Sequence, residues 1–163
     1  MGVYKYIILG VLIFIIGWLS ADLYSFVTNL NIEKPFSFSD NELKSPSDWV
    51  KEDQIKIYQN RVLINIENAS WARFSDTNSM DPLIDEESNS IEIKPRSNED
   101  LKVGDIISYE AKFTKGTLIH RIVKIDYDED GWYALTKGDN NKNIDPQKVR
   151  FEQIKGVLIG IIY

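Results

Sequence analysis

The sequence predicts a mainly β domain, partly closed as a barrel or sandwich, behind one amino-terminal transmembrane helix. Three observations predict this fold class. A long apolar segment begins the chain, short runs rich in β-branched and aromatic residues recur from Gln54 onward, and no helical period stands out after residue 53. Because open strand edges pair with other chains, we expect the sheet to be closed or partly closed.

The apolar segment from Tyr6 to Ala21 contains no charged residue. As a helix it covers roughly 24 Å, and apolar residues after Asp22 extend it toward the ~30 Å of a hydrocarbon core. We predict an uncleaved anchor over residues 1–30. A cleaved signal peptide is the alternative, but Leu19 stands where its cleavage site requires a small residue. Positive charge at Lys5 predicts a cytoplasmic tail and a domain on the extracytoplasmic side of the cell membrane.

Composition sets the remaining boundaries. Residues 31–53, rich in Ser, Asp, Asn and Pro, predict a polar linker, and residues 54–163 predict the folded domain.

The 163 residues carry 19 Lys and Arg against 25 Asp and Glu, a net charge of −6, which argues against nucleic-acid binding. The absence of cysteine excludes disulfides and thiolate sites, and one histidine excludes a zinc site that needs two. No cofactor is expected.

Alternating and β-branched runs locate the strands. We expect them on both sides of a turn at Gln59–Asn60, at Ile91–Ile93, at Asp105–Phe113, at Leu118–Asp126 and Gly131–Thr136 around an acidic turn, and at Val157–Tyr163.

Two acidic stretches resemble part of a calcium loop. The spacing of Asp126–Asp130 matches the first half of an EF-hand, but Lys137 stands at its twelfth position, where a bidentate glutamate is required. The stretch Asp139–Asp145 fails in the same way, with Arg150 at that position. Strands rather than helices are expected around both. We therefore predict no metal site.

Three residue types suggest nucleophilic chemistry. Ser79 lies in a turn-like stretch, His120 lies on an apolar strand, and Asp139 and Asp145 follow. Alone, each is more typical of a turn or of a packed side chain. Together, a serine, a histidine and an aspartate in this order meet the requirements of a serine hydrolase, because the hydroxyl needs a base and the base needs a carboxylate. Spacing along the chain leaves open whether they meet in space.

These blocks, behind an anchor, resemble signal peptidase I, in its endoplasmic-reticulum and archaeal branch with a Ser-His-Asp site. The resemblance is carried by Asn78–Pro82 (NSMDP), Gly104–Ile107 (GDII), His120–Arg121, and Lys137–Asn141 (KGDNN) with Asp145. It implies a signal-peptidase-like catalytic domain and a serine endopeptidase in membrane lipid that removes signal peptides from exported preproteins. It also implies a preference for small residues at the cleavage site. Accessory membrane subunits are left open.

The resemblance also implies roles for individual residues. Ser79 is expected to be the nucleophile and His120 the general base. Asp145 is expected to be the orienting carboxylate, and Asp139 an additional acidic residue that supports the site. The Ser79 backbone N–H and the Thr77 hydroxyl are expected to bind the oxyanion.

The sequence departs from the family pattern at Asn78, where glycine is usual, and in the polar, acidic stretch Leu83–Val103. Asparagine tolerates a left-handed backbone, so we expect the turn to persist. The departures leave open an inactive or repurposed anchored β-domain that binds exported or surface proteins. In such a domain, Ser79 and His120 are expected to lie beyond hydrogen-bonding reach. A relative of the repressor-type autoproteases is disfavoured, since no basic DNA-binding segment is visible.

Overall fold

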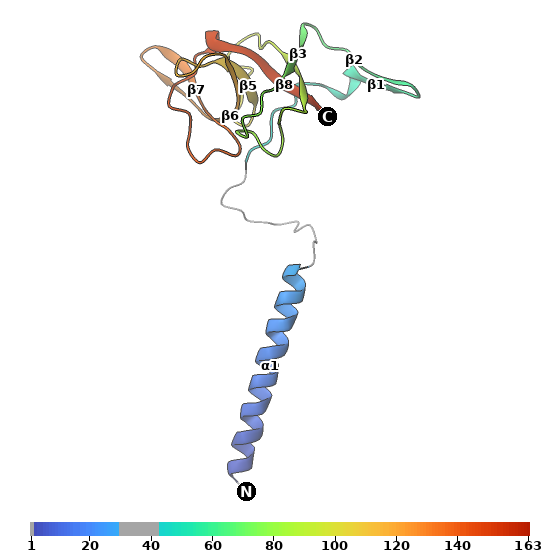
Figure 1. Ribbon diagram of the computed structural model, residues 1–163, viewed down its shortest axis with the longest axis vertical. Helices are drawn as coiled ribbons and strands as arrows, with labels where there is room; N and C mark the ends of the chain where they lie inside the picture. The colour runs from blue at the N-terminus through green and yellow to red at the C-terminus, as the bar shows by residue number, and fades with distance from the viewer. Residues whose placement is uncertain (1, 30–42) are drawn as a thin grey trace. The chain divides into compact units, whose positions relative to one another are not determined.

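A computed structural model of the chain describes residues 2–29 and 43–163 (Figure 1). The chain divides into two compact units, Met1–Glu42 and Leu43–Tyr163, and each is considered by itself. Residues 31–42 of the predicted linker lie outside the described residues. The division into anchor, linker and domain at residues 30 and 53 therefore stays a prediction.

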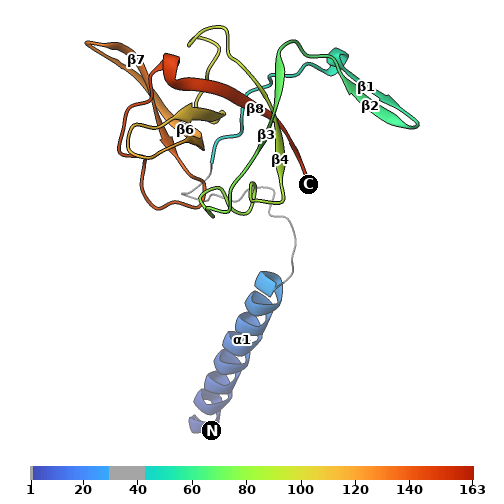
Figure 2. The same cartoon turned by 45° about the horizontal axis from the view of Figure 1, so that its top comes forward.

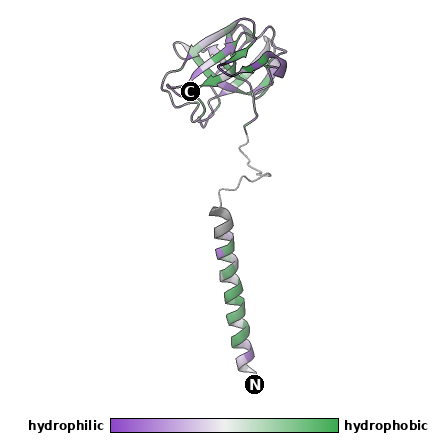
Figure 3. Cartoon of the chain, turned by 90° about the vertical axis from the view of Figure 1, so that its right-hand side faces the viewer, coloured by the Kyte–Doolittle hydropathy of each residue, from purple (hydrophilic) through white to green (hydrophobic). Residues whose placement is uncertain are grey.

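Helix α1 (Val3–Asn29) forms the described part of the first unit. Its stretch Tyr4–Tyr24 is long and apolar enough to cross a membrane, with 21 residues and a mean hydropathy of 2.2. Figure 3 shows apolar residues along most of its length. The Ser20 hydroxyl donates to the Ile16 carbonyl oxygen at 2.8 Å, so this polar group is satisfied within the helix. Length and composition are thus compatible with a membrane anchor.

The second unit is an antiparallel β domain. Its described residues form β1 (Ile55–Tyr58), β2 (Arg61–Ile64), β3 (Ala69–Arg73), β4 (Asn89–Ile93), β5 (Ile106–Glu110), β6 (Thr117–Asp128), β7 (Gly131–Lys137) and β8 (Ile154–Ile162), with short 3₁₀ turns at Glu52–Gln54 and Phe151–Gln153. Strands β1 and β2 form a separate hairpin (Figure 2). The others form a six-stranded sheet in the order β3-β4-β8-β5-β6-β7. The predicted fold class, mainly β behind one apolar helix, is confirmed.

Strand β6 organises one end of the sheet because it pairs with two neighbours in succession. Thr117–Arg121 pairs with β5, and the remainder, beginning again at Arg121, pairs with β7. The register shifts between Ile122 and Lys124. Such an irregularity bends a strand and increases its local twist. The expected hairpin is present, but β6 runs to Asp128, two residues beyond its predicted end, which tightens the acidic turn.

The core lies on both faces of the sheet. Adjacent residues of one strand point to opposite faces, and on β5 both Ile106 and Ile107 are at most 1% exposed. Ile107 belongs to the larger apolar cluster, and Ile106 packs in a smaller one with Met80 and Ile84. Met80 belongs to the segment after β3, so burial of its side chain holds that segment against the sheet.

Part of the predicted linker packs on the domain. The Ser47 backbone N–H donates to Asp105 Oδ1 at 2.7 Å, and the Lys102 N–H donates to Asp105 Oδ2 at 2.8 Å. Asp105 is fully buried, so these two hydrogen bonds compensate for the loss of water around its carboxylate. Beside it, Gly104 has a φ of +111° and lies directly against the Ser45 carbonyl oxygen.

We expect Gly104→Ala to lower the free energy of unfolding by about 3 kcal/mol, because an unfavourable φ adds to a collision with the Ser45 backbone. The matched control is Gly116→Ala, where φ is +106° but no atom lies within 4 Å of the added Cβ. That control is expected to lose only about 1 kcal/mol. Urea unfolding of the full chain in detergent, followed by tryptophan fluorescence, measures both. Equal losses would contradict the close packing at Ser45.

Candidate active site

Ser79 lies in the segment that connects β3 to β4, and neighbours on both sides fix it. Met80, which follows, is 2% exposed within the smaller apolar cluster. Asn78, which precedes it, has a φ of +54°, so the left-handed backbone expected at this position is confirmed. The Asn140 backbone N–H donates to the Ser79 carbonyl at 3.0 Å, and the Asn140 amide donates to the Asn78 carbonyl at 2.8 Å.

The turn after β7 therefore holds the backbone of the serine. Its approach depends on Gly138, where an added Cβ would lie 2.5 Å from the Ser79 carbonyl oxygen and 2.7 Å from Asn141 Nδ2. Any side chain there forces one of the two segments to move. The close contact between this turn and Ser79 thus explains why glycine, and no larger residue, stands at the second position of KGDNN.

His120 lies on β6, opposite Ile107 of β5, and is 4% exposed. Its Nε2 is 3.1 Å from the Ser79 hydroxyl oxygen. Its Nδ1 is 2.7 Å from Asp145 Oδ2. The ring packs edge-on against Tyr109, with 6.5 Å between ring centroids. The structure thus brings Ser79, His120 and Asp145 into one chain of hydrogen-bonding distances.

Asp145 is positioned by three further contacts. Its backbone N–H donates to the Thr136 carbonyl oxygen at 2.8 Å. Its Oδ2 accepts hydrogen bonds from the Tyr109 hydroxyl at 2.8 Å and the Thr136 hydroxyl at 2.7 Å, in addition to His120. Burial acts to raise the pKa of Asp145, but the hydrogen bonds from His120, Thr136 and Tyr109 outweigh it and hold the pKa below its usual value. Asp145 is therefore ionised at neutral pH.

The charge on Asp145 determines how the neighbouring groups carry their protons. An ionised carboxylate only accepts hydrogen bonds, so His120 carries its proton on Nδ1. In the neutral ring Nε2 is then an acceptor and faces the Ser79 hydroxyl. Burial raises the pKa of Tyr109, more than the contact with Thr136 lowers it, and Asp145 raises it further. Tyr109 is thus a neutral phenol that donates to the carboxylate.

Thr77 and Asp139 occupy different surroundings. The Thr77 hydroxyl oxygen is 3.3 Å from the Ser79 hydroxyl oxygen. Asp139 instead faces Arg121, whose Nε donates to Oδ1 at 2.8 Å and whose second terminal nitrogen donates to Oδ2 at 2.6 Å. The other terminal nitrogen of Arg121 donates to the carbonyls of Lys44 and Gly104. The two acidic candidates are therefore separated: Asp145 contacts the imidazole, and Asp139 contacts the guanidinium.

Sequence reasoning missed Tyr109 and Thr136. Both are buried on strands, where a tyrosine and a threonine are ordinary strand residues. The pairing of β5 with β6 is what places Tyr109 near His120. Ile107 lies opposite His120, and Tyr109 lies two residues further along β5 on the same face. The register between β5 and β6 could not be read from the sequence alone.

Basic side chains bind the carboxylates of the calcium-like pattern. Asp128 Oδ2 accepts from Lys148 at 2.5 Å and from Arg150 at 2.8 Å, and these contacts hold the pKa of Asp128 well below its usual range. Lys124 donates to Asp126 at 2.7 Å. Within residues 2–29 and 43–163, no group of three or more His, Cys, Asp or Glu side chains is arranged to hold a metal ion.

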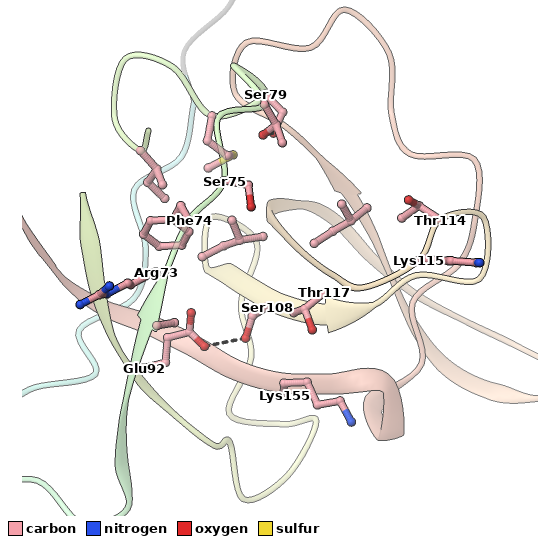
Figure 4. A pocket seen from close by; sticks show the side chains of 16 residues that line it. Arg73, Phe74, Ser75, Ser79, Glu92, Ser108, Thr114, Lys115, Thr117 and Lys155 are labelled. Atoms are coloured by element: carbon pink, nitrogen blue, oxygen red, sulfur yellow. Dashed lines mark hydrogen bonds between the residues drawn. The ribbon is translucent and has the colours of Figure 1, made fainter. Parts of the chain in front are cut away.

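A cavity of about 500 Å³ opens beside Ser79 and Thr77. Its walls come from the end of β3 and the segment after it, from β4 and β5, from the start of β6 and from β8. Figure 4 shows Ser79 at one end of this cavity. The nucleophile candidate thus faces a space large enough for several side chains of a bound peptide.

A part of this chain is similar to a signal peptidase subunit. Over 40 residues it is 42% identical to the signal peptidase complex catalytic subunit SEC11 of Clavispora lusitaniae. The match covers 24% of this chain and 24% of that relative, so the chain matches about a quarter of the relative's length. No protein-family model matches the chain, and no solved structure matches it. The similarity agrees with a signal peptidase relationship for part of the chain.

We expect Asp139→Ala to lower the free energy of unfolding by about 3 kcal/mol, because it leaves the buried Arg121 guanidinium without its carboxylate. Asp126→Ala is the matched control, since it removes an aspartate whose partner Lys124 is more than half exposed. Exposed ion pairs contribute little, so the control is expected to unfold nearly as the wild type does. Chemical unfolding of the full chain in detergent measures both variants. An unchanged midpoint for Asp139→Ala would contradict this role of the ion pair.

Proposed function

We propose that this protein is a membrane-anchored serine endopeptidase that cleaves signal peptides from exported preproteins. The observation that carries the proposal is the series of contacts from the Ser79 hydroxyl through His120 to Asp145, at 3.1 Å and 2.7 Å. The partial similarity to a signal peptidase catalytic subunit supports the choice of substrate. The 3.1 Å distance also favours a peptidase over an inactive binding domain, for which a separation beyond hydrogen-bonding reach is expected.

In the proposed mechanism, Ser79 Oγ attacks the scissile carbonyl carbon while His120 Nε2 takes its proton. The new imidazolium is stabilised by the Asp145 carboxylate, which stays ionised because of its lowered pKa. His120 then gives the proton to the leaving amine. Water attacks the acyl-enzyme in the second half of the reaction, again with His120 as the base. Tyr109 and Thr136 act through Asp145, so they are positioning residues.

The negative charge that develops on the carbonyl oxygen needs donors beside Ser79. We assign the Ser79 backbone N–H and the Thr77 hydroxyl, which lies 3.3 Å from the Ser79 hydroxyl oxygen in the free protein. Thr77 is held less firmly than a backbone donor, because its hydroxyl can rotate. Asp139 supports the site indirectly, since the turn that contains it holds the Ser79 carbonyl through Asn140.

The proposed substrate is an extended peptide. Strand β3 is an edge of the six-stranded sheet, and its end lines the cavity beside Ser79. A peptide can bind along such an edge through backbone hydrogen bonds, with alternate side chains entering the cavity. The family resemblance adds a preference for small residues next to the cleaved bond.

The membrane setting follows from the apolar helix. We propose that Tyr4–Tyr24 spans the cell membrane once, with the amino terminus in the cytoplasm and the β domain outside. An anchored domain acts near the bilayer surface, where the segment that follows a signal peptide's apolar stretch is exposed. Accessory membrane subunits are compatible with this arrangement.

Ser79→Ala and His120→Ala are each expected to reduce cleavage of a preprotein by about 10⁴-fold or more, since each removes one member of the reacting pair. Cleavage in detergent micelles, followed by gel electrophoresis, measures the loss. Ser97→Ala, in the loop between β4 and β5, is the control and should cleave as the wild type does. Full activity in Ser79→Ala or His120→Ala would overturn the assignment. Tight preprotein binding without cleavage by the wild type would favour the binding-domain alternative.

Asp145→Asn and Asp139→Asn separate the roles of the two aspartates. Asparagine at 145 can donate to His120 Nδ1 and so favours the wrong tautomer, and kcat is expected to fall by about 10³- to 10⁴-fold. Asparagine at 139 leaves that tautomer unchanged, so kcat should fall far less while stability decreases. Steady-state kinetics and urea unfolding of the same samples distinguish the two effects. The reverse order of kcat losses would make Asp139 the orienting carboxylate.

A further inference from the structure

A buried carboxylate lines the cavity beside Ser79. Glu92 of β4 is 6% exposed. Its Oε2 accepts a hydrogen bond from the Ser108 hydroxyl at 2.6 Å, and its Oε1 accepts one from the Ser90 hydroxyl at 3.1 Å. Figure 4 shows Glu92 and Ser108 at the end of the cavity away from Ser79. The proposed catalytic mechanism does not use this group.

The local backbone is shaped around Glu92. The pairing of β4 with β8 shifts register between Ile91 and Glu92, and such irregularities re-aim side chains. On β8, Gly156 leaves room for the carboxylate, because an added Cβ would lie 2.6 Å from Glu92 Oε2. The carboxylate is therefore held in one position by two serines and a glycine on three neighbouring strands.

Glu92 lacks a cationic partner within the part of the chain that the structure describes, because none of the ion pairs there includes it. Three basic residues also line the cavity, but Lys155 is bonded to Glu110 at 2.7 Å, and Arg73 and Lys115 are exposed to solvent. Charges in solvent are screened, whereas a buried carboxylate acts through a medium of lower dielectric constant. Two neutral hydroxyl donors compensate a buried carboxylate only in part.

We propose that Glu92 is a specificity-determining residue that binds the ammonium or guanidinium group of a lysine or arginine side chain in the substrate. This inference rests on the proposed peptidase function and adds a second subsite to it, at the end of the cavity away from the cleaved bond. In the free protein the carboxylate is already oriented by its two hydrogen bonds, so it need not be reordered when the cation binds. Charge-assisted hydrogen bonds of this kind are short and strong.

The test uses the full chain in detergent micelles and alanine-rich peptides labelled with a fluorophore and a quencher. Lysine or norleucine, its uncharged analogue of similar length, is placed in turn at each residue within six positions of the cleaved bond. At one position, away from the bond, kcat/KM is expected to be about tenfold higher for lysine than for norleucine, a difference of ~1.4 kcal/mol. Absence of a lysine preference at every position would overturn the proposal.

Glu92→Gln keeps the shape of the side chain and removes its charge. The lysine-to-norleucine ratio in this variant is expected to fall to about one, whatever happens to the absolute rate. Glu129→Gln, an exposed residue in the turn between β6 and β7, removes the same charge and should keep the tenfold ratio. If Glu92 only held strands together, Glu92→Gln would change stability and leave the ratio intact. Retention of the ratio would therefore overturn the proposal.

Two further measurements separate this inference from the proposed function. Ser108→Ala keeps the charge of Glu92 but removes its shortest orienting hydrogen bond, so the lysine-to-norleucine ratio should fall below that of the wild type and stay above one, even if Glu92→Gln fails to fold. An unchanged ratio in a folded Ser108→Ala variant would count against Glu92. If the wild type cleaves no peptide, the peptidase proposal fails. Fluorescence anisotropy with Ser79→Ala then still tests Glu92, because the lysine peptide should bind about tenfold more tightly than the norleucine peptide.

Discussion

The ion pair between Arg121 and Asp139 joins four parts of the domain: β6, the turn after β7, the loop at Gly104 and the segment at Lys44. Both side chains are less than a tenth exposed, so burial of either charge without the other would lower the stability of the domain. The turn that Asp139 fixes is also the turn that holds the backbone of Ser79. The position of the serine therefore depends on an ion pair that does not touch its hydroxyl.

Much of the fold could be predicted, because alternating residues and turn residues are local signals. The two hairpins and the final strand lie close to where the sequence places them, and the left-handed backbone of Asn78 follows from its residue type. Local signals do not give the partners of distant residues. Two aspartates six positions apart have the same chemistry, and only the folded chain brings Asp145 to His120 and Asp139 to Arg121.

Burial was the harder property to predict. The alternation Ile91-Glu92-Ile93 is typical of a strand with one face in water, yet Glu92 is 6% exposed. Its carboxylate accepts a hydrogen bond from Ser108, and Gly156 of β8 lets it approach. Tyr109 presents a related case. Its hydroxyl reaches Asp145 only because β5 and β6 pair in one register, and a shift of one residue would turn it to the opposite face.

His120 is the one histidine of the chain, and its two ring nitrogens face two different groups. Any imidazole signal in a nuclear magnetic resonance spectrum of this chain therefore comes from His120, so no mutant is needed to assign it. The ¹⁵N shifts of Nδ1 and Nε2 report which nitrogen carries the proton. The hydrogen bond to Asp145 and the contact with Ser79 can thus be followed separately, in the intact molecule and while a peptide occupies the cavity.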